Sequence, residues 1–166
     1  MVEITIEDPC QPDIVALLAA SDAYMATLYP AESNHMLDVA SLQRPEVTFV
    51  VARDDGRAVG CGALVKSGER WAEIKRMFVA PEARGQKLGR RLIEKLESIA
   101  IDNGVSLLRL ETGAKQPEAL LLYRSVGFIE TGPFGHYSPD PLSIFMEKVI
   151  ARDGCAEPQQ KGRGRG

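Results

Sequence analysis

The chain has 166 residues, of which 45% are hydrophobic and 26% charged, and it carries a net charge of −3. This length favours a single domain, and the composition is typical of a globular protein. The slightly acidic balance argues against a general nucleic-acid-binding protein. No apolar run approaches the ~18 residues that a membrane span needs.

The N-terminus and the cysteines predict the compartment. The first residues, MVEITIEDPCQPD, are acidic and lack the basic and apolar blocks of a secretory signal. Three scattered cysteines, Cys10, Cys61 and Cys155, have the spacing of neither a metal site nor a disulfide framework. With only His35 and His136 beside them, no metal site is expected. These observations predict a cytoplasmic protein without a metal.

The first part of the chain predicts alternating strands and helices. Residues 2–7 alternate apolar and polar side chains, which is typical of a half-buried strand. Helical apolar spacing then predicts a helix that Asp13 caps and that reaches Leu28. The Asp-Asp-Gly turn at 54–56 predicts a hairpin. A polar loop, a short helix and the two hairpin strands are expected at 28–35, 36–42, 47–53 and 57–65.

The central stretch, 71–104, predicts a strand, a sharp turn and a long helix. The strand ends at Pro81, which lacks an N–H, and an amphipathic helical spacing runs from Gln86 to a stop at Gly104. The strands at 47–53, 57–65 and 71–79 should form an antiparallel meander. A strand at 105–111 should then pair in parallel with 71–79 through a right-handed crossover.

The last part predicts a helix at 117–125, a strand from Gly127 and a final strand at 142–149. The segment between these strands, 132–141, is rich in glycine and proline and predicts an irregular loop. Apolar periodicity ends at Ala151. We therefore expect one domain over 1–150 and a disordered, inert tail over 151–166.

The turn RGQKLGRR at 84–91 predicts an anion-binding site. Its four cations and two glycines lie where a helix begins, and unpaired N–H groups and the helix dipole favour an anion there. Gly85 and Gly89 lack a Cβ and would let a ligand approach the backbone. The pattern is neither a P-loop nor a dinucleotide fingerprint. Composition alone leaves open that this is a basic surface helix.

This stretch resembles the acetyl-CoA-binding core of the GCN5-related N-acetyltransferases, the GNAT superfamily. Their signature, (R/Q)-x-x-G-x-(G/A), follows a strand that ends near Val-x-Pro. Arg84, Gly89 and the exit at 79–81 match, whereas Lys87 replaces the middle glycine. The resemblance extends over 47–148, and the predicted element order, β-α-α-β-β-β-α-β-α-β-β, is also that of the family. It implies an α/β (α+β) GNAT fold, with a mixed sheet of about seven strands, helices on both faces and a splayed parallel pair at its centre.

The resemblance implies acetyl-CoA as cofactor. The pantetheine arm would lie along the backbone of Met77, Phe78 and Val79 like an added strand, between residues 75–79 and 107–111. The N–H near Phe78 would donate to the thioester oxygen, and Gln116 would contact the arm. The pyrophosphate would lie on the turn formed by Arg84, Gly85, Gln86, Lys87, Leu88, Gly89 and Arg90.

Two side chains are the candidate catalytic groups. Tyr123 precedes a Gly-Phe pair as in many family members, and the resemblance implies that its hydroxyl protonates the leaving thiolate. Glu73 is the candidate general base for an incoming ammonium, with Glu111 as the runner-up, because a half-desolvated carboxylate has a raised pKa. The structural alternatives are a core-edge aromatic for Tyr123 and a solvent-facing glutamate for Glu73.

The acceptor pocket is expected in two loops, at 28–35 and 132–141. Carboxylates there suit a cationic amine, and histidines could relay protons; the alternative is that all are hydrated loop residues. The two loops resemble those of a small bacterial acetyltransferase subgroup, some of whose members are named for indole-acetic acid. The candidate acceptor-binding residues are Tyr29, Glu32, Ser33, Asn34, His35, Phe134, His136, Tyr137 and Asp140.

The sequence therefore predicts an acetyl-CoA-dependent N-acetyltransferase that acts on a small-molecule amine. Neither nucleic acid nor a membrane is expected as a partner, and homodimers are common in this fold. Two alternatives remain open. One is a catalytically silent acyl-CoA-binding sensor, and the other is a protein lysine or N-terminal acetyltransferase.

Overall fold

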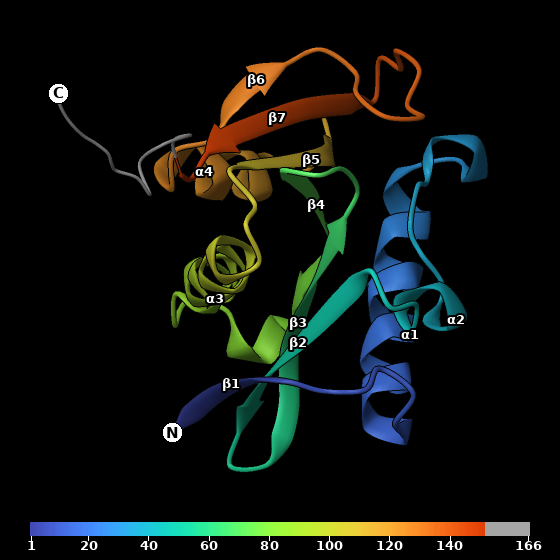
Figure 1. Ribbon diagram of the computed structural model, residues 1–166. Coiled ribbons are helices and arrows are strands. Elements are labelled where there is room, and N and C mark those ends of the chain that lie inside the picture. The colour runs from blue at the N-terminus through green and yellow to red at the C-terminus, as the bar shows by residue number, and fades with distance from the viewer. Residues whose placement is uncertain (152–166) are drawn as a thin grey trace, which may run out of the picture.

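Seven strands form one mixed sheet in the order β1-β2-β3-β4-β5-β7-β6 (Figure 1). The computed structural model describes residues 1–151, so the predicted tail lies outside the described residues from residue 152 onward. The pair β4 and β5 is parallel, and the other neighbours are antiparallel. The antiparallel meander β2-β3-β4 and the parallel pair are as the sequence predicted. The strands are β1 (Val2–Ile6), β2 (Val47–Asp54), β3 (Arg57–Lys66), β4 (Trp71–Val79), β5 (Leu107–Gly113), β6 (Ile129–Thr131) and β7 (Ser143–Val149).

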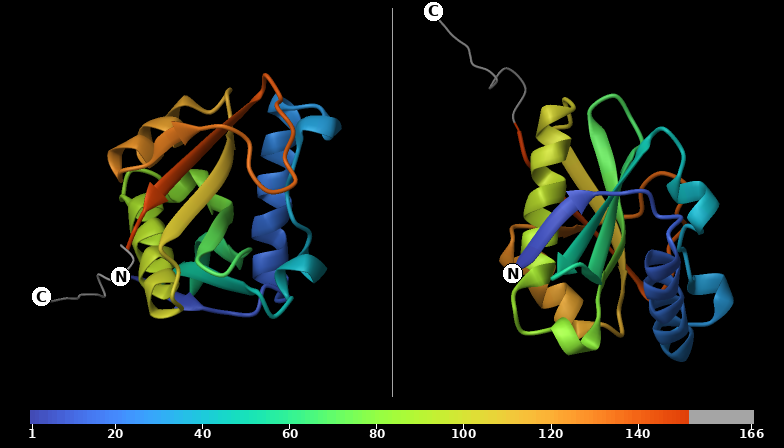
Figure 2. Two further views of the ribbon diagram at one scale, coloured as in Figure 1. Left: turned by 45° about the horizontal axis from the view of Figure 1, so that its top comes forward. Right: turned by 90° about the horizontal axis from the view of Figure 1, so that it is seen from below.

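Helices cover both faces of this sheet, which confirms the expected layers (Figures 1 and 2). The helix expected at 36–42 is shorter than predicted, because the carboxylate of Asp38 accepts from the N–H of Ser41 at 2.8 Å and so starts the helix at Val39. No helix within residues 1–151 is both long and apolar enough to cross a membrane. One face carries α1 (Pro12–Leu28) and α2 (Val39–Leu42), and the other carries α3 (Leu88–Asp102) and α4 (Pro117–Ser125).

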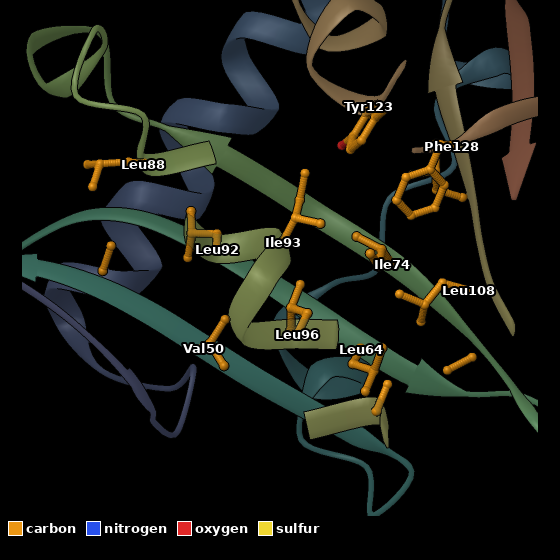
Figure 3. Packing of buried hydrophobic residues seen from close by; sticks show 14 of the residues in the cluster. Val50, Leu64, Ile74, Leu88, Leu92, Ile93, Leu96, Leu108, Tyr123 and Phe128 are labelled. Carbon is orange, nitrogen blue, oxygen red and sulfur yellow. The ribbon is translucent and has the colours of Figure 1, made fainter. Parts of the chain in front are cut away.

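The larger core lies between α3 and the sheet. The apolar face of α3 buries Leu88, Leu92, Ile93, Leu96 and Ala100. In Figure 3, Leu92, Ile93 and Leu96 lie over labelled buried residues of β2, β3, β4 and β5, which are Val50, Leu64, Ile74 and Leu108. Each fully buried aliphatic side chain contributes roughly 1.5–3 kcal/mol, so this packing fixes α3, and with it the turn that precedes α3, against the sheet.

The parallel pair separates halfway along its length. Pairing of β4 with β5 runs from Trp71 opposite Leu107 to Ile74 opposite Leu110 and goes no further. Beyond it, Arg76 has a φ of +59°, and the register between β3 and β4 shifts there, as in a β-bulge. Strand β5 meanwhile stays paired with β7 as far as Gly113.

This separation corrects one expectation. The sequence placed the splay between 75–79 and 107–111, but residues 107–110 pair with 71–74. The open gap instead lies between 75–79 and 111–113. The bulge at Arg76 turns the end of β4 away, which sequence spacing does not reveal. Backbone groups on the facing edges of the two strands are left for another partner.

Candidate active site

A cavity of about 340 Å³ occupies the gap between the separated strands. Its walls come from the ends of β4 and β5, from α4, from the last turns of α1 and from the segment that follows α1. Of the predicted cofactor and acceptor residues, those that line it are Tyr29, Ser33, Asn34, His35, Met77, Phe78, Val79, Arg84, Gly89, Gln116 and Tyr123. The fold thus brings half of the predicted site residues, from both the cofactor and the acceptor sets, to one cavity.

The anion-binding turn lies at one end of this cavity. Arg84 donates from its Nε to the carbonyl of Val79 at 3.1 Å, and its guanidinium lies 5.9 Å from the ring centroid of Tyr24. Gly85 has a φ of +91°, which favours glycine. No side chain caps the N-terminus of α3, so its first N–H groups remain free for an anion.

The backbone conformation of Lys87 explains how a lysine can replace the middle glycine of the family signature. It is the N-cap of α3 and has a φ of +60° and a ψ of 28°, the left-handed conformation that glycine adopts without a steric cost. The lysine therefore keeps the backbone path of the glycine that it replaces and adds an exposed cation. The structure does not expose Leu88, whose side chain is buried in the core, so Leu88 can offer a ligand only its N–H.

Coenzyme A fits the residues along this wall. The turn supplies free N–H groups and cations for a pyrophosphate, and no strand pairs with Met77, Phe78 and Val79 on the β5 side. The extended, amide-rich pantetheine can pair with such a strand edge. Gln116 also lines the cavity, with its Oε1 accepting from the hydroxyl of Tyr29 at 3.3 Å.

Tyr123 projects from α4 into the cavity. Its side chain is 7% exposed and packs edge-on to Phe128. The hydroxyl has no hydrogen-bond partner among residues 1–151, and its oxygen is not completely buried. Because Tyr123 lines the cavity, we infer that this oxygen is exposed to the cavity. Burial, assisted by the nearby carboxylate of Glu111, raises the pKa of Tyr123. The group is therefore a neutral O–H donor at physiological pH.

Glu111 also lines the cavity, near the end of β5. Its carboxylate accepts from the hydroxyl of Ser143 at 2.8 Å. Desolvation raises the pKa of Glu111; the hydrogen bond from Ser143 and the charges of His35 and Lys75 oppose the rise, and the charge of Glu73 adds to it. A carboxyl group with a raised pKa suits proton transfer near neutral pH.

Glu73, the base predicted from the sequence, is placed differently. It is buried, and its Oε2 accepts from the hydroxyl of Tyr137 at 2.5 Å and from the ammonium of Lys75 at 3.3 Å. Glu73 is not among the residues that line the cavity, whereas Lys75 and Glu111 are. Its carboxylate already accepts hydrogen bonds from Tyr137 and Lys75. The geometry therefore favours the runner-up, Glu111, as the carboxylate that faces a ligand.

The two predicted acceptor loops meet beside the cavity. The hydroxyl of Ser33 donates to Asp140 at 2.7 Å, and the ring of His35 meets that of Tyr137 edge-on at 5.3 Å. Figures 1 and 2 show the loop before β7, in orange, beside the end of α1. Asp140 therefore positions Ser33 rather than lining the cavity.

Several of the predicted acceptor-binding residues do not line the cavity. Glu32 and His136 are exposed and do not line the cavity. Phe134 is buried in an aromatic cluster with Trp71, Tyr137 and Phe145. Sequence alone could not separate these residues from Ser33 and His35, because nothing in a loop's composition specifies which side chains turn inward.

Sequence reasoning also missed residues that line the cavity. The sequence could have indicated Lys75, because regular strand alternation would place Lys75 on the same side as Glu73 and Met77. The sequence could not have indicated Arg76, since only the bulge brings this residue to the cavity wall. Its Nη1 pairs with Asp22 at 2.7 Å, and its Nη2 donates to the carbonyl of Leu18 at 3.2 Å.

Comparison with known proteins gives the family. The model of the Acetyltransferase (GNAT) family matches residues 16–128. A protein of Azospirillum brasilense named IAA acetyltransferase is 51% identical over 150 residues, which cover 90% of this chain and 98% of that protein. A Klebsiella pneumoniae structure, assigned by name to the acyl-CoA N-acyltransferases, is 40% identical with a TM-score of 0.78 and covers 90% of this chain and 98% of that one.

A more distant structure shares the fold alone. The PaiA N-acetyltransferase of Thermoplasma acidophilum, solved in complex with coenzyme A, is 20% identical with a TM-score of 0.69 and covers 90% of this chain and 99% of that one. Members of the family use acetyl-CoA, so the predicted cofactor is confirmed at that level. The family match over more than half of the chain and the full-length similarity to the A. brasilense protein agree with the splayed sheet and the anion-binding turn: the chain belongs to the acetyltransferase (GNAT) family.

Proposed function

We propose that the protein transfers an acetyl group from acetyl-CoA directly to the amine of a small molecule. One observation carries the proposal: the Tyr123 hydroxyl and the Glu111 carboxylate reach the same cavity, at whose end the anion-binding turn lies. A proton donor and a proton acceptor that line one cavity match the need of the reaction for an acid and a base.

Two segments of the chain are proposed to hold acetyl-CoA. Bound acetyl-CoA supplies an activated acetyl thioester. The turn from Arg84 to Arg90 holds the pyrophosphate, and the backbone from Met77 to Val79 holds the pantetheine and donates to the thioester oxygen.

The proton transfers balance the acetyl transfer. Glu111 accepts the proton that the incoming ammonium must lose, the amine nitrogen forms a bond to the acetyl carbon, and the carbon–sulfur bond breaks. Tyr123 then gives its proton to the sulfur, and the second proton of the attacking nitrogen, which leaves as the amide forms, returns to the Tyr123 oxygen through water. Glu73 remains the alternative base. From its present position it would act through a water or through Lys75, since its own carboxylate is bonded to Tyr137 and Lys75.

The loops favour a small acceptor over a protein. The contacts from Ser33 to Asp140 and from His35 to Tyr137 join two loops beside the cavity. An extended polypeptide would need an open groove at this place. The A. brasilense relative is named for IAA, so IAA belongs in a substrate panel beside primary amines.

The test is acetyl-CoA turnover with such a panel, measured as free thiol released and as product mass. We expect release of thiol that depends on an acceptor, with one acetyl group gained per product. A catalytically silent sensor would instead bind acetyl-CoA, with a rise in Tm, and release no thiol with any acceptor. A melting temperature that millimolar acetyl-CoA leaves unchanged would contradict both proposals.

A further inference from the structure

We infer that the acceptor carries a carboxylate close to its amine, and that Lys75 binds this carboxylate while Glu111 faces the amine. This inference rests on the proposed function, and it narrows the acceptor from amines in general to amino acids and similar zwitterions. Lys75 is then a specificity-determining residue, which neither the sequence motif nor the family match indicates.

The first observation is an unused donor on a buried cation. The Lys75 side chain is only 12% exposed, and Lys75 lines the cavity. Its ammonium group has three N–H donors. One bonds the hydroxyl of Tyr137 at 2.5 Å and one bonds Glu73 at 3.3 Å; the third has no protein partner among residues 1–151. Buried donors are normally paired, so this one suits an acceptor atom on a ligand.

The second observation is that Lys75 cannot swing away. The ammonium donates to both Tyr137 and Glu73, and it also lies 5.2 Å from the ring centroid of Tyr137. Tyr137 in turn packs against Phe134, Phe145 and His35. A fixed ammonium gives a ligand a charge in a defined place, without the entropy that a free lysine would lose on binding.

The third observation is the neighbouring charge of opposite sign. Glu111 lines the same cavity from β5, and the positive charge of Lys75 is near enough to act on the ionisation of Glu111. A cavity lined by a negative and a positive group is complementary to an ammonium and a carboxylate on one small molecule.

The same arrangement disfavours polycationic acceptors. A polyamine or an aminoglycoside that offered one amine to Glu111 would bring further ammonium groups toward Lys75. Like charges brought together in a partly desolvated cavity are costly, and such repulsion is a common source of specificity.

The test uses three acceptors that share one side chain: an amino acid, its carboxamide, and the amine that remains when the carboxylate is removed. The carboxamide loses its ammonium proton more easily than the amino acid, so intrinsic reactivity favours the carboxamide. We expect the enzyme to reverse this order, with a kcat/KM for the amino acid at least about tenfold above both analogues, which corresponds to ~1.4 kcal/mol.

Lys75→Met provides the matched variant. It should raise KM for the amino acid about tenfold or more, leave KM for acetyl-CoA unchanged and bring the three acceptors to similar kcat/KM. Lys75→Arg, which keeps the charge, should retain part of the preference. Lys66→Met is the control, because Lys66 is exposed and its ammonium donates to the carbonyl of Asn103 at 3.3 Å, away from the cavity-lining residues.

Each outcome decides the inference. A wild-type enzyme that acetylates the carboxamide or the decarboxylated amine as well as the amino acid overturns it, and leaves the proposed acetyl transfer standing. Release of no thiol with any acceptor overturns the proposed function and this inference together. The wild-type comparison suffices even if Lys75→Met, which leaves Glu73 buried without its cation, fails to fold.

Discussion

The two ends of the cavity are built by different means. At the cofactor end the backbone makes the site, through the uncapped start of α3, the glycine at 85 and the edge of β4. At the acceptor end side chains make it, through contacts such as Ser33 with Asp140 and Tyr137 with Glu73, which lie 107 and 64 residues apart in the chain.

This difference has a consequence for specificity. Main-chain geometry is shared by all chains with the fold, so the cofactor end is set once the strand, the turn and α3 have formed. Each contact at the acceptor end depends on one pair of residues and can be exchanged without disturbing the sheet. The acceptor can therefore differ among family members while the cofactor stays the same.

The largest expected effect comes from the base. Glu111→Gln keeps the shape and can still accept from Ser143, but it cannot take a proton. At neutral pH kcat should fall about 10²–10⁴-fold, with the affinity for acetyl-CoA unchanged. Glu73→Gln is the comparison. If Glu73→Gln instead gives the larger loss of kcat and alters the pH profile, then Glu73 is the base.

Glu111→Gln should also change how stability depends on pH. Burial raises the pKa of Glu111 above its usual 4.5, so the folded protein keeps a proton that the unfolded chain loses first. The resulting stabilisation is present below pH 4.5 and is lost as the pH rises through the folded-state pKa. Relative to wild type, the variant should gain stability as pH rises, which urea unfolding at several pH values measures. A constant difference would show that Glu111 is not perturbed.

The next effect belongs to the acid. Tyr123→Phe keeps the ring packed against Phe128 and removes only the hydroxyl, which has no protein partner within the described chain. We expect kcat to fall about 10²-fold, with Tm nearly unchanged because no hydrogen bond to the protein is lost. Steady-state kinetics with the true acceptor measure this, and full retention of kcat would remove Tyr123 from the mechanism.

A smaller and more selective effect is expected where the acceptor loops meet. Asp140→Ala removes the acceptor of the bond from Ser33 and also the carboxylate that caps the N–H of Leu142 at 2.8 Å. KM for the acceptor should rise severalfold, in keeping with ~1 kcal/mol for such a contact, and KM for acetyl-CoA should not change. Equal changes in both KM values would mean that the two ends of the cavity are not independent.

The smallest effect concerns the turn. Lys87→Gly should leave the backbone of the turn in place, since glycine adopts a φ near +60° freely. Relief of the left-handed strain, about 1 kcal/mol, is opposed by the greater freedom of glycine in the unfolded chain, so stability should change by less than ~1 kcal/mol. Affinity for acetyl-CoA should fall modestly with the loss of one cation, as titration calorimetry would show.

The same difference between the two ends explains what the sequence could predict. The strand over 71–79 and the helix over 117–125 have the predicted bounds, and α3 begins within the segment 84–91 as expected, because proline, glycine and apolar periodicity act locally. Nothing in the sequence favours Glu111 over Glu73, because both are glutamates on predicted strands. Only the bulge at Arg76 and the bond from Tyr137 to Glu73 separate their roles, and both depend on tertiary contacts.

The most direct test of this account is a crystal structure of the protein with coenzyme A. The account predicts a pantetheine arm between residues 75–79 and 111–113, a pyrophosphate on the first N–H groups of α3, and the sulfur within hydrogen-bonding distance of the Tyr123 hydroxyl. It also predicts that the Glu111 carboxylate faces the open space beyond the sulfur. A coenzyme whose sulfur lies away from Tyr123, or a pantetheine outside the gap between β4 and β5, would contradict the account.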